Sequence, residues 1–349
     1  MTKVIFTLFI FVAVLFYCNT ASAKIWRVNN NAGVSADFTD LPAAITGASA
    51  GDTIELESSA TAYSTGVITK RLVIIGTGYF LSGTTVNPNT QWNTNPSTVS
   101  VIECPFGSAG SVIEGLVISG EILLGDSDIT VQRNLMSTGI LELCFSHNSN
   151  ADTIRQNYID EITNNGTTFT ASGLLIYNNI ILSSITFNGA AINNINGFII
   201  NNDVGSTTNG AANFNVANFT LQNNILFSPS FGTTLNSNVY FNNISNNAVI
   251  PAGNGNVNSV ANFTTAVYVD WGFGPGFSTD GAFVLASSSP AIGAGALNGS
   301  TVDCGAFGGP APYILSGMPA IPSIYSLTAP TQVLVGTASI NVSISSASH

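Results

Sequence analysis

Charged residues are scarce in this chain of 349 residues, at 7% of the sequence, against roughly 25% in an ordinary soluble domain. Basic residues are the rarer class, with 7 Lys and Arg against 18 Asp and Glu and a formal net charge of −11. Nucleic-acid binding is excluded, because contacts to phosphates require clustered basic side chains. Disorder is not expected either, because 45% of the residues are hydrophobic.

Long apolar runs are missing outside the amino terminus, where Val4–Tyr17 form an apolar core interrupted only by Thr7. Lys3 precedes this core and Ala21-Ser22-Ala23 follows it, which is the pattern of a secretory signal peptide. The core is shorter than the roughly 20 residues of a membrane-spanning helix. We therefore predict cleavage after Ala23 and a protein that is secreted or on the cell surface, with no membrane span after cleavage. The periplasm is the alternative location.

Cysteine is too rare for a scaffold held by disulfides. The mature chain would keep Cys104, Cys144 and Cys304, an odd number that allows at most one intramolecular disulfide. His147 follows Cys144 by three residues, but no second pair of Cys or His at the spacing of metal ligands accompanies them, so we expect no zinc site. We predict that the three cysteines are small buried apolar residues, and the sequence does not decide their disulfide status.

The chain is instead rich in Asn, Ser, Thr and Gly, and one asparagine recurs in register through its middle. Each copy follows a short strand-like segment, as in Thr153-Ile-Arg-Gln-Asn-Tyr-Ile159. The repeated asparagines, which are almost evenly spaced, are Asn134, Asn157, Asn179, Asn202, Asn224 and Asn243. A fixed period of about 22 residues with short strands indicates a solenoid. Leucine-rich repeats share the period, but their Leu frame and their helices do not show here.

Asparagine suits a buried turn, where the backbone polar groups need partners. Its amide donates and accepts at once, so we expect stacked amides to bond to the turn backbone and to one another. Gly115 takes the same place in the repeat that precedes Asn134. This alignment puts Glu114 beside Arg133 in one column of adjacent coils, which are about 4.8 Å apart. It puts Arg155 beside Tyr177 in the next column.

These repeats make the chain resemble the right-handed parallel β-helix proteins of the pectin-lyase-like superfamily. Residues 37–45 and 50–56 resemble the helix that caps the first coil of such proteins and the strand after it. Residues 289–295 and 303–307 resemble the closing turns of secreted bacterial members. The resemblance implies an all-β fold, a single-stranded right-handed parallel β-helix with an N-terminal capping helix. It implies no single function, since the superfamily includes lyases, hydrolases, adhesins and structural proteins.

Residues 310–349 differ from the repeats. Five prolines from Pro310 to Pro330 exclude a helix there, and Ser339–Ile344 alternates as a half-buried strand does. We expect an extended C-terminal β tail that either caps the solenoid or serves as a sorting element. The predicted organisation is a signal peptide at 1–23, a capped β-helix at 24–309 and a proline-punctuated tail at 310–349.

Groups for acid–base catalysis are missing from more than half of the mature chain, since no Lys, Arg or His occurs from Gln156 to Ser348. A lyase needs a cation to stabilise the charge that develops on the substrate, and a glycoside hydrolase needs two carboxylates. Our first expectation is a secreted non-catalytic β-solenoid, either a structural surface element or a glycan-binding protein. The alternative is a polysaccharide lyase or glycoside hydrolase acting on an extracellular polysaccharide.

One central region has residues that suit a ligand. We predict a carbohydrate-binding strip in which Tyr177 stacks on a sugar ring while Arg133 and Arg155 hold an acidic group. A plain surface ion pair between Glu114 and Arg133 is the structural alternative. If the protein is an enzyme, we expect Arg155 to act with Glu114, Asp152 or Asp160.

Calcium is the one cofactor that the sequence leaves open. The acidic residues that offer oxygen ligands are Asp126, Asp128, Asp152, Asp160 and Glu161. They stand at different offsets from the repeated asparagine, so they share no column and we assign no metal site. For partners, we expect a polysaccharide, or a second copy bound through the uncovered ends of the solenoid.

Overall fold

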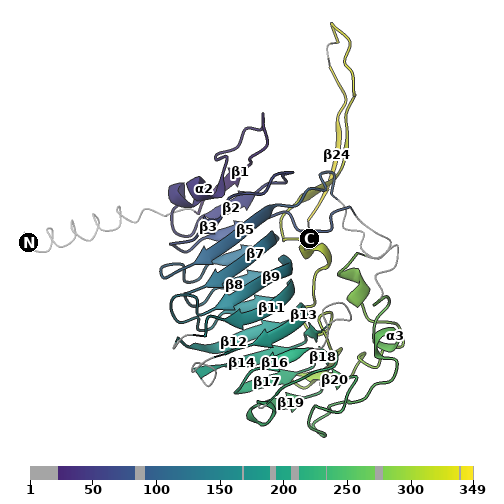
Figure 1. Cartoon of the computed structure of the whole chain (residues 1–349). Helices are drawn as coiled ribbons and strands as arrows, with labels where there is room; N and C mark the ends of the chain where they lie inside the picture. Colours follow the sequence, from purple (N-terminus) through teal and green to yellow (C-terminus); the bar gives the residue numbers. More distant parts are fainter. Residues whose placement is uncertain are drawn as a thin grey trace, which may run out of the picture.

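The computed structural model describes residues 23–82, 91–166, 169–188, 194–205, 212–232, 234–271, 278–337 and 339–348. Its body is a parallel β-solenoid built around two ten-stranded sheets, A and B (Figure 1). The expected all-β solenoid is therefore confirmed. The predicted signal peptide lies outside the described residues except for Ala23. Within them, no helix is both long enough and apolar enough to span a membrane.

Sheet A stacks one strand from each coil in chain order. Its strands are β1 (Ile25–Val28), β2 (Thr53–Leu56), β4 (Val73–Ile75), β6 (Val112–Glu114), β8 (Thr130–Gln132), β10 (Thr153–Arg155), β12 (Ala171–Tyr177), β14 (Ile195–Ile200), β17 (Phe219–Gln222) and β19 (Val239–Phe241). Ile154, Ile176 and Ile199 lie opposite one another on successive strands and are fully buried. Alternate residues of each strand thus face the core, and the residues between them face outward.

Sheet B contains the longer strands of each coil. Its strands are β3 (Gly66–Val67), β5 (Thr98–Cys104), β7 (Val117–Leu124), β9 (Leu135–Leu143), β11 (Tyr158–Asn164), β13 (Ile180–Thr186), β15 (Asp203–Val204), β16 (Asn213–Asn215), β18 (Ile225–Leu226) and β20 (Ile244–Ser245). In β11 the register shifts between Ile159 and Glu161, and such bulges bend a strand. Ile159 and Ile162, on the two sides of this bulge, are both fully buried.

The repeated asparagines stack inside the turn from sheet A to sheet B, and all six are fully buried. Asn179 is typical: its Oδ1 accepts from the backbone N–H of Asn157 at 3.0 Å and from the Asn157 side chain at 3.0 Å. The same pattern continues from Asn134 through Asn243. It ends on Asn256, whose Oδ1 accepts from Asn243.

The residue before each ladder asparagine has a left-handed backbone, with φ between 50° and 56°, and so does Gly115 one coil earlier, with φ of 72°. We call this column the αL corner, and its members are Gly115, Arg133, Gln156, Asn178, Asn201, Asn223 and Asn242. Gly and Asn tolerate this conformation best, which explains the Asn-Asn pairs of the later coils.

The predicted alignment of Gly115 with Asn134 is wrong by one residue. Glu114 pairs with Gln132, and Val117 pairs with Leu135. Gly115 therefore lies opposite Arg133 in the αL corner, and Leu116 occupies the place of the ladder asparagine. The alignment was misplaced because Gly115 was matched to the ladder asparagine. It instead matches the left-handed residue before that asparagine, a conformation that glycine adopts easily.

The first coil carries the helix α2 (Leu41–Gly47), which begins where the Asp40 side chain accepts from the Ala43 N–H at 2.8 Å. Leu41, Ala44 and Ile45 of this helix are buried in the solenoid core. The three cysteines Cys104, Cys144 and Cys304 are buried, as predicted, and none of them forms a disulfide. Cys104 and Cys144 belong to the same core.

After β20 the chain leaves the stack and returns along the outside of the solenoid toward the first coils (Figure 1). The elements of this returning chain are α3 (Phe263–Val267), η3 (Gly281–Phe283), β21 (Gly295–Leu297), β22 (Ser300–Val302), η4 (Leu315–Gly317), β23 (Ser323–Thr328) and β24 (Ser343–Ala347). A further short helix, η2 (Leu235–Ser237), lies within the stack just before β19. β21 pairs only with β22, and β23 only with β24. The strands of sheets A and B thus end at Ser245, and one further parallel bridge joins Ile244 to Val257. The β23–β24 hairpin projects away from the body (Figure 1).

We call residues 296–322 the strap, because they run along the αL corner. Asn178 Nδ2 donates to the backbone oxygens of Ala306 at 2.8 Å and Gly308 at 2.7 Å. Gln156, one coil earlier, donates to Pro312 O at 2.6 Å. The strap therefore follows the coils backward, and residues far apart in sequence lie side by side.

The returning segment also buries the outer face of sheet B. Tyr158, Ile180 and Ile225 on that face share a second apolar cluster with Phe283 and Tyr313 of the returning chain. Sheet B is thus covered on both faces over these coils, which explains its nearly continuous apolar runs. Sheet A keeps an exposed outer face.

Candidate functional site

The outer face of sheet A carries a strip of polar side chains from four consecutive strands, of which Glu114 and Gln132 are buried and Arg155 and Tyr177 are half-buried. Glu114, Gln132, Arg155 and Tyr177 lie opposite one another in one column on β6, β8, β10 and β12. The predicted pairing of Arg155 with Tyr177 is therefore present, with Arg155 Nη1 donating to the Tyr177 hydroxyl at 3.1 Å. The guanidinium lies 6.0 Å from the centre of the Tyr177 ring.

Gln132 connects this strip, and sequence reasoning missed it. Its Nε2 donates to Glu114 Oε2 at 2.7 Å, and its Oε1 accepts from Arg155 Nε at 2.6 Å. Arg155 therefore bonds to neutral partners. Among the described residues no carboxylate forms an ion pair with it.

Arg133 forms the predicted ion pair with Glu114, at 2.9 Å and with side-chain exposures of 18% and 10%. It does so from the αL corner rather than from the strip. Arg133 also donates to Gln156 Oε1 at 3.0 Å and to the backbone oxygen of Met318 at 3.2 Å. These bonds tie Arg133 to the strap, so it has little left to offer a ligand.

The three acids expected to act with Arg155 in an enzyme, Glu114, Asp152 and Asp160, do not lie together around it. Asp152 is fully buried, with Oδ1 accepting from the Ile129 N–H at 2.8 Å, and burial raises its pKa to about 8. Asp160 stands on β11 in sheet B, while Arg155 stands on β10 in sheet A. Only Glu114 reaches the arginine, through Gln132.

No metal centre shows in the described part of the chain, where no group of three or more His, Cys, Asp or Glu side chains is placed to hold an ion. Asp126, one of the acids considered for calcium, instead accepts from the backbone N–H groups of Gly107 and Ala109. It therefore supports a turn.

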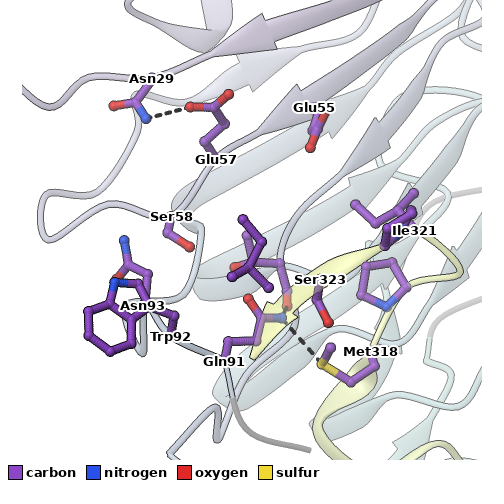
Figure 2. Close-up of a pocket in the computed structure, with 14 residues that line it drawn as sticks. Asn29, Glu55, Glu57, Ser58, Gln91, Trp92, Asn93, Met318, Ile321 and Ser323 are labelled. Carbon is purple, nitrogen blue, oxygen red and sulfur yellow. Dashed lines mark hydrogen bonds between the residues drawn. The ribbon is translucent and has the colours of Figure 1, made fainter. Parts of the chain in front are cut away.

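A pocket of about 300 Å³ lies beside the first coils (Figure 2). We call it the Trp92 pocket. Its lining residues come from the first coils, from residues 91–93 and from the end of the strap and the hairpin after it, and they are Asn29, Glu55, Glu57, Ser58, Thr77, Gln91, Trp92, Asn93, Met318, Pro319, Ile321, Pro322, Ser323 and Ile324. Glu55 shares the column of the strip, since it pairs through Ile75 with Glu114. Ile75 on β4 separates Glu55 from the strip in this column.

Two carboxylates in this pocket have different surroundings. Glu57 forms an ion pair with Arg27 at 2.5 Å, and its Oε2 accepts from Asn29 Nδ2 at 2.6 Å. Glu55 has no hydrogen bond or ion pair to any described residue. Burial and the neighbouring negative charge of Glu57 both raise the Glu55 pKa, while Arg27 opposes the shift. Glu55 is thus a half-buried carboxylate without a partner among the described residues.

Trp92 supplies the aromatic wall, with 59% of its surface exposed. Its backbone N–H donates to Ile324 O at 2.9 Å, and Gln91 Nε2 donates to Thr77 O at 2.8 Å. Segments from the early and the late parts of the chain therefore meet at the pocket rim, which fixes its shape.

Sequence reasoning missed this pocket because one of its walls is the docked strap. One signal was available: alternation along Asp52-Thr-Ile-Glu-Leu-Glu57 places Glu55 and Glu57 on the same outer face. No family model matches the chain, and no curated protein matches it at a significant level. The function is therefore argued from this surface.

Proposed function

We propose that the protein is an extracellular, non-catalytic β-solenoid that binds a glycan chain along sheet A, from the Trp92 pocket toward Tyr177. The observation that carries the proposal is the exposed ring of Trp92 beside a pocket with amide and carboxylate groups. Aromatic rings bury large apolar area, and binding pockets combine such rings with a few placed polar groups. Secretion is supported by the signal-peptide pattern that ends at Ala23.

The shape of the surface supports a chain-like ligand. Glu55, Glu114 and Tyr177 lie along one column of hydrogen-bonded parallel strands, so their positions are fixed by the backbone. A rigid surface loses little conformational entropy on binding. A chain-like ligand can therefore meet Glu55 at one end of this column and the half-buried Tyr177 at the other, while Glu114 between them is buried.

Affinity electrophoresis and calorimetry against a panel of neutral, acidic and amino glycans test the proposal. We expect Trp92→Ala to weaken binding at least about tenfold, or roughly 1.4 kcal/mol. Phe106→Ala is the matched control, since Phe106 is 72% exposed and outside the pocket and strip. Binding that is equal in wild type and Trp92→Ala, or a panel without any ligand, would contradict the proposal.

A glycoside hydrolase is the second candidate, and the carboxylate pair Glu55 and Glu57 favours it. Hydrolases use two carboxylates in unlike environments, one of which holds a proton. The raised Glu55 pKa and the bonded state of Glu57 fit that division. A reducing-end assay decides: turnover that disappears in Glu55→Gln supports the hydrolase, and none in wild type refutes it. A lyase has less support, because Arg27 beside this pocket is already paired.

A further inference from the structure

The charges in the Trp92 pocket do not balance. Glu55 and Glu57 contribute two carboxylates, and Arg27 is the basic residue that neutralises one of them. Glu57 is engaged on both oxygens, by Arg27 and by Asn29. Glu55 faces the same pocket without a hydrogen bond or ion pair to any described residue. A carboxylate in a pocket with no partner among the described residues is open to a cationic ligand.

We propose that the Trp92 pocket selects glycans with free amino groups, and that Glu55 binds the ammonium of such a sugar. This inference rests on the proposed glycan-binding function and names its ligand class. An ammonium offers three donors, which suit the free oxygens of Glu55. The Trp92 side chain lies at the rim of the same pocket and is 59% exposed, so it can contact a sugar ring of the bound chain. The Oε1 of Gln91 and the Nδ2 of Asn93 form no hydrogen bond to a described residue and remain for sugar hydroxyls.

Other ligands fit this pocket less well. An acidic glycan would bring a third negative charge beside two carboxylates, in a chain with a net charge of −11. A neutral or N-acetylated sugar would leave Glu55 unpaired. A metal ion would find two carboxylates, one of which Arg27 holds, and no group of three or more ligating side chains occurs among the described residues.

The test compares hexamers of glucosamine and N-acetylglucosamine by calorimetry on the full chain at low salt with EDTA present. We expect the glucosamine hexamer to bind at least about tenfold more tightly, and Glu55→Gln to remove that preference. Glu121→Gln is the matched control, because Glu121 is exposed on β7 in sheet B and outside the pocket. Thermal unfolding of both variants, followed by circular dichroism, checks that they fold.

The outcomes separate the two proposals. Equal binding of both hexamers, unchanged in Glu55→Gln but lost in Trp92→Ala, would overturn the selectivity and leave glycan binding in place. Failure of both hexamers and of every other glycan would remove both proposals. A lysine pentapeptide that binds as tightly as the glucosamine hexamer, and loses affinity in Glu55→Gln, would also contradict the inference, since it would make the pocket a general ammonium site.

Discussion

Two neighbouring residues divide the task of turning the chain from sheet A to sheet B. Asn178 adopts the left-handed conformation and donates outward to the strap, while Asn179 points inward and joins the ladder. The inward role was predictable, because a buried turn needs a side chain that donates and accepts. The outward role was not, because its partners, Ala306 and Gly308, lie far later in the chain.

Asn179→Ala tests the ladder. The change leaves the Asn157 N–H and the Ile154 carbonyl without the bonds that Asn179 makes at 3.0 Å and 2.9 Å. Each buried group left unpaired costs about 1–3 kcal/mol, so we expect the free energy of unfolding to fall by about 3 kcal/mol in denaturant titration. Asn165→Ala is the control, since Asn165 is exposed and surface changes cost within about 0.5 kcal/mol. Equal losses in the two variants would show that the ladder contributes nothing special.

Asp152 gives the fold a pH dependence. Burial raises its pKa to about 8, from an ordinary value of 3.8, so the folded state keeps the proton while the unfolded state releases it. The stabilisation is complete below pH 4 and is lost as pH rises toward 8. We expect the free energy of unfolding of Asp152→Asn to equal that of wild type near pH 4. Above pH 4 it should exceed the wild-type value by up to about 1.4 kcal/mol for each pH unit.

Urea titrations of both proteins from pH 4 to 8 measure this difference. Asp203 and Asp280 also have raised pKa values, but they are present in both proteins, so the difference isolates Asp152. A stability difference that stays constant with pH would contradict the assignment.

At the scale of elements, the strap is what the sequence could not predict. Residues 296–322 have no repeat, and their carbonyl oxygens accept from side chains of the αL corner and of its neighbours, which no sequence pattern encodes. The same applies to Asn256, which extends the ladder beyond Asn243 at a much shorter interval than the repeat. The regular coils were predictable because their period repeats; the Trp92 pocket was not, because the strap forms one wall.

Asn178→Gly and Asn178→Ala test how the corner holds the strap. Both variants lose the two bonds to Ala306 and Gly308, but glycine keeps the left-handed backbone without strain. We expect faster hydrogen exchange across residues 303–313 in both variants, and a larger loss of unfolding free energy in Asn178→Ala, by about 0.5–1 kcal/mol. Exchange that stays as slow as in wild type would show that the strap is held by its apolar contacts alone.

At the scale of the whole molecule, the outer face of sheet A changes along the solenoid axis. Its early coils carry Glu55, Glu114 and Arg155, whereas its later coils expose Phe198 and Val239 at 45% and 48%. The basic residues end at Arg155 in the sequence, apart from the terminal His349, so the later coils offer no cation for a ligand. This asymmetry is why we propose glycan binding for the half of the face that contains the Trp92 pocket.

Tryptophan fluorescence tests the central claim, that a glycan lies against Trp92, most directly. Trp92 is 59% exposed, whereas Trp271 is 7% exposed and Trp26 is partly buried with its indole N–H bonded to Asp52. Titration with the glucosamine hexamer is predicted to shift the emission saturably to shorter wavelength in wild type, and to leave it unchanged in Trp92→Phe. Binding heat that saturates in calorimetry while the wild-type emission stays constant would contradict the account.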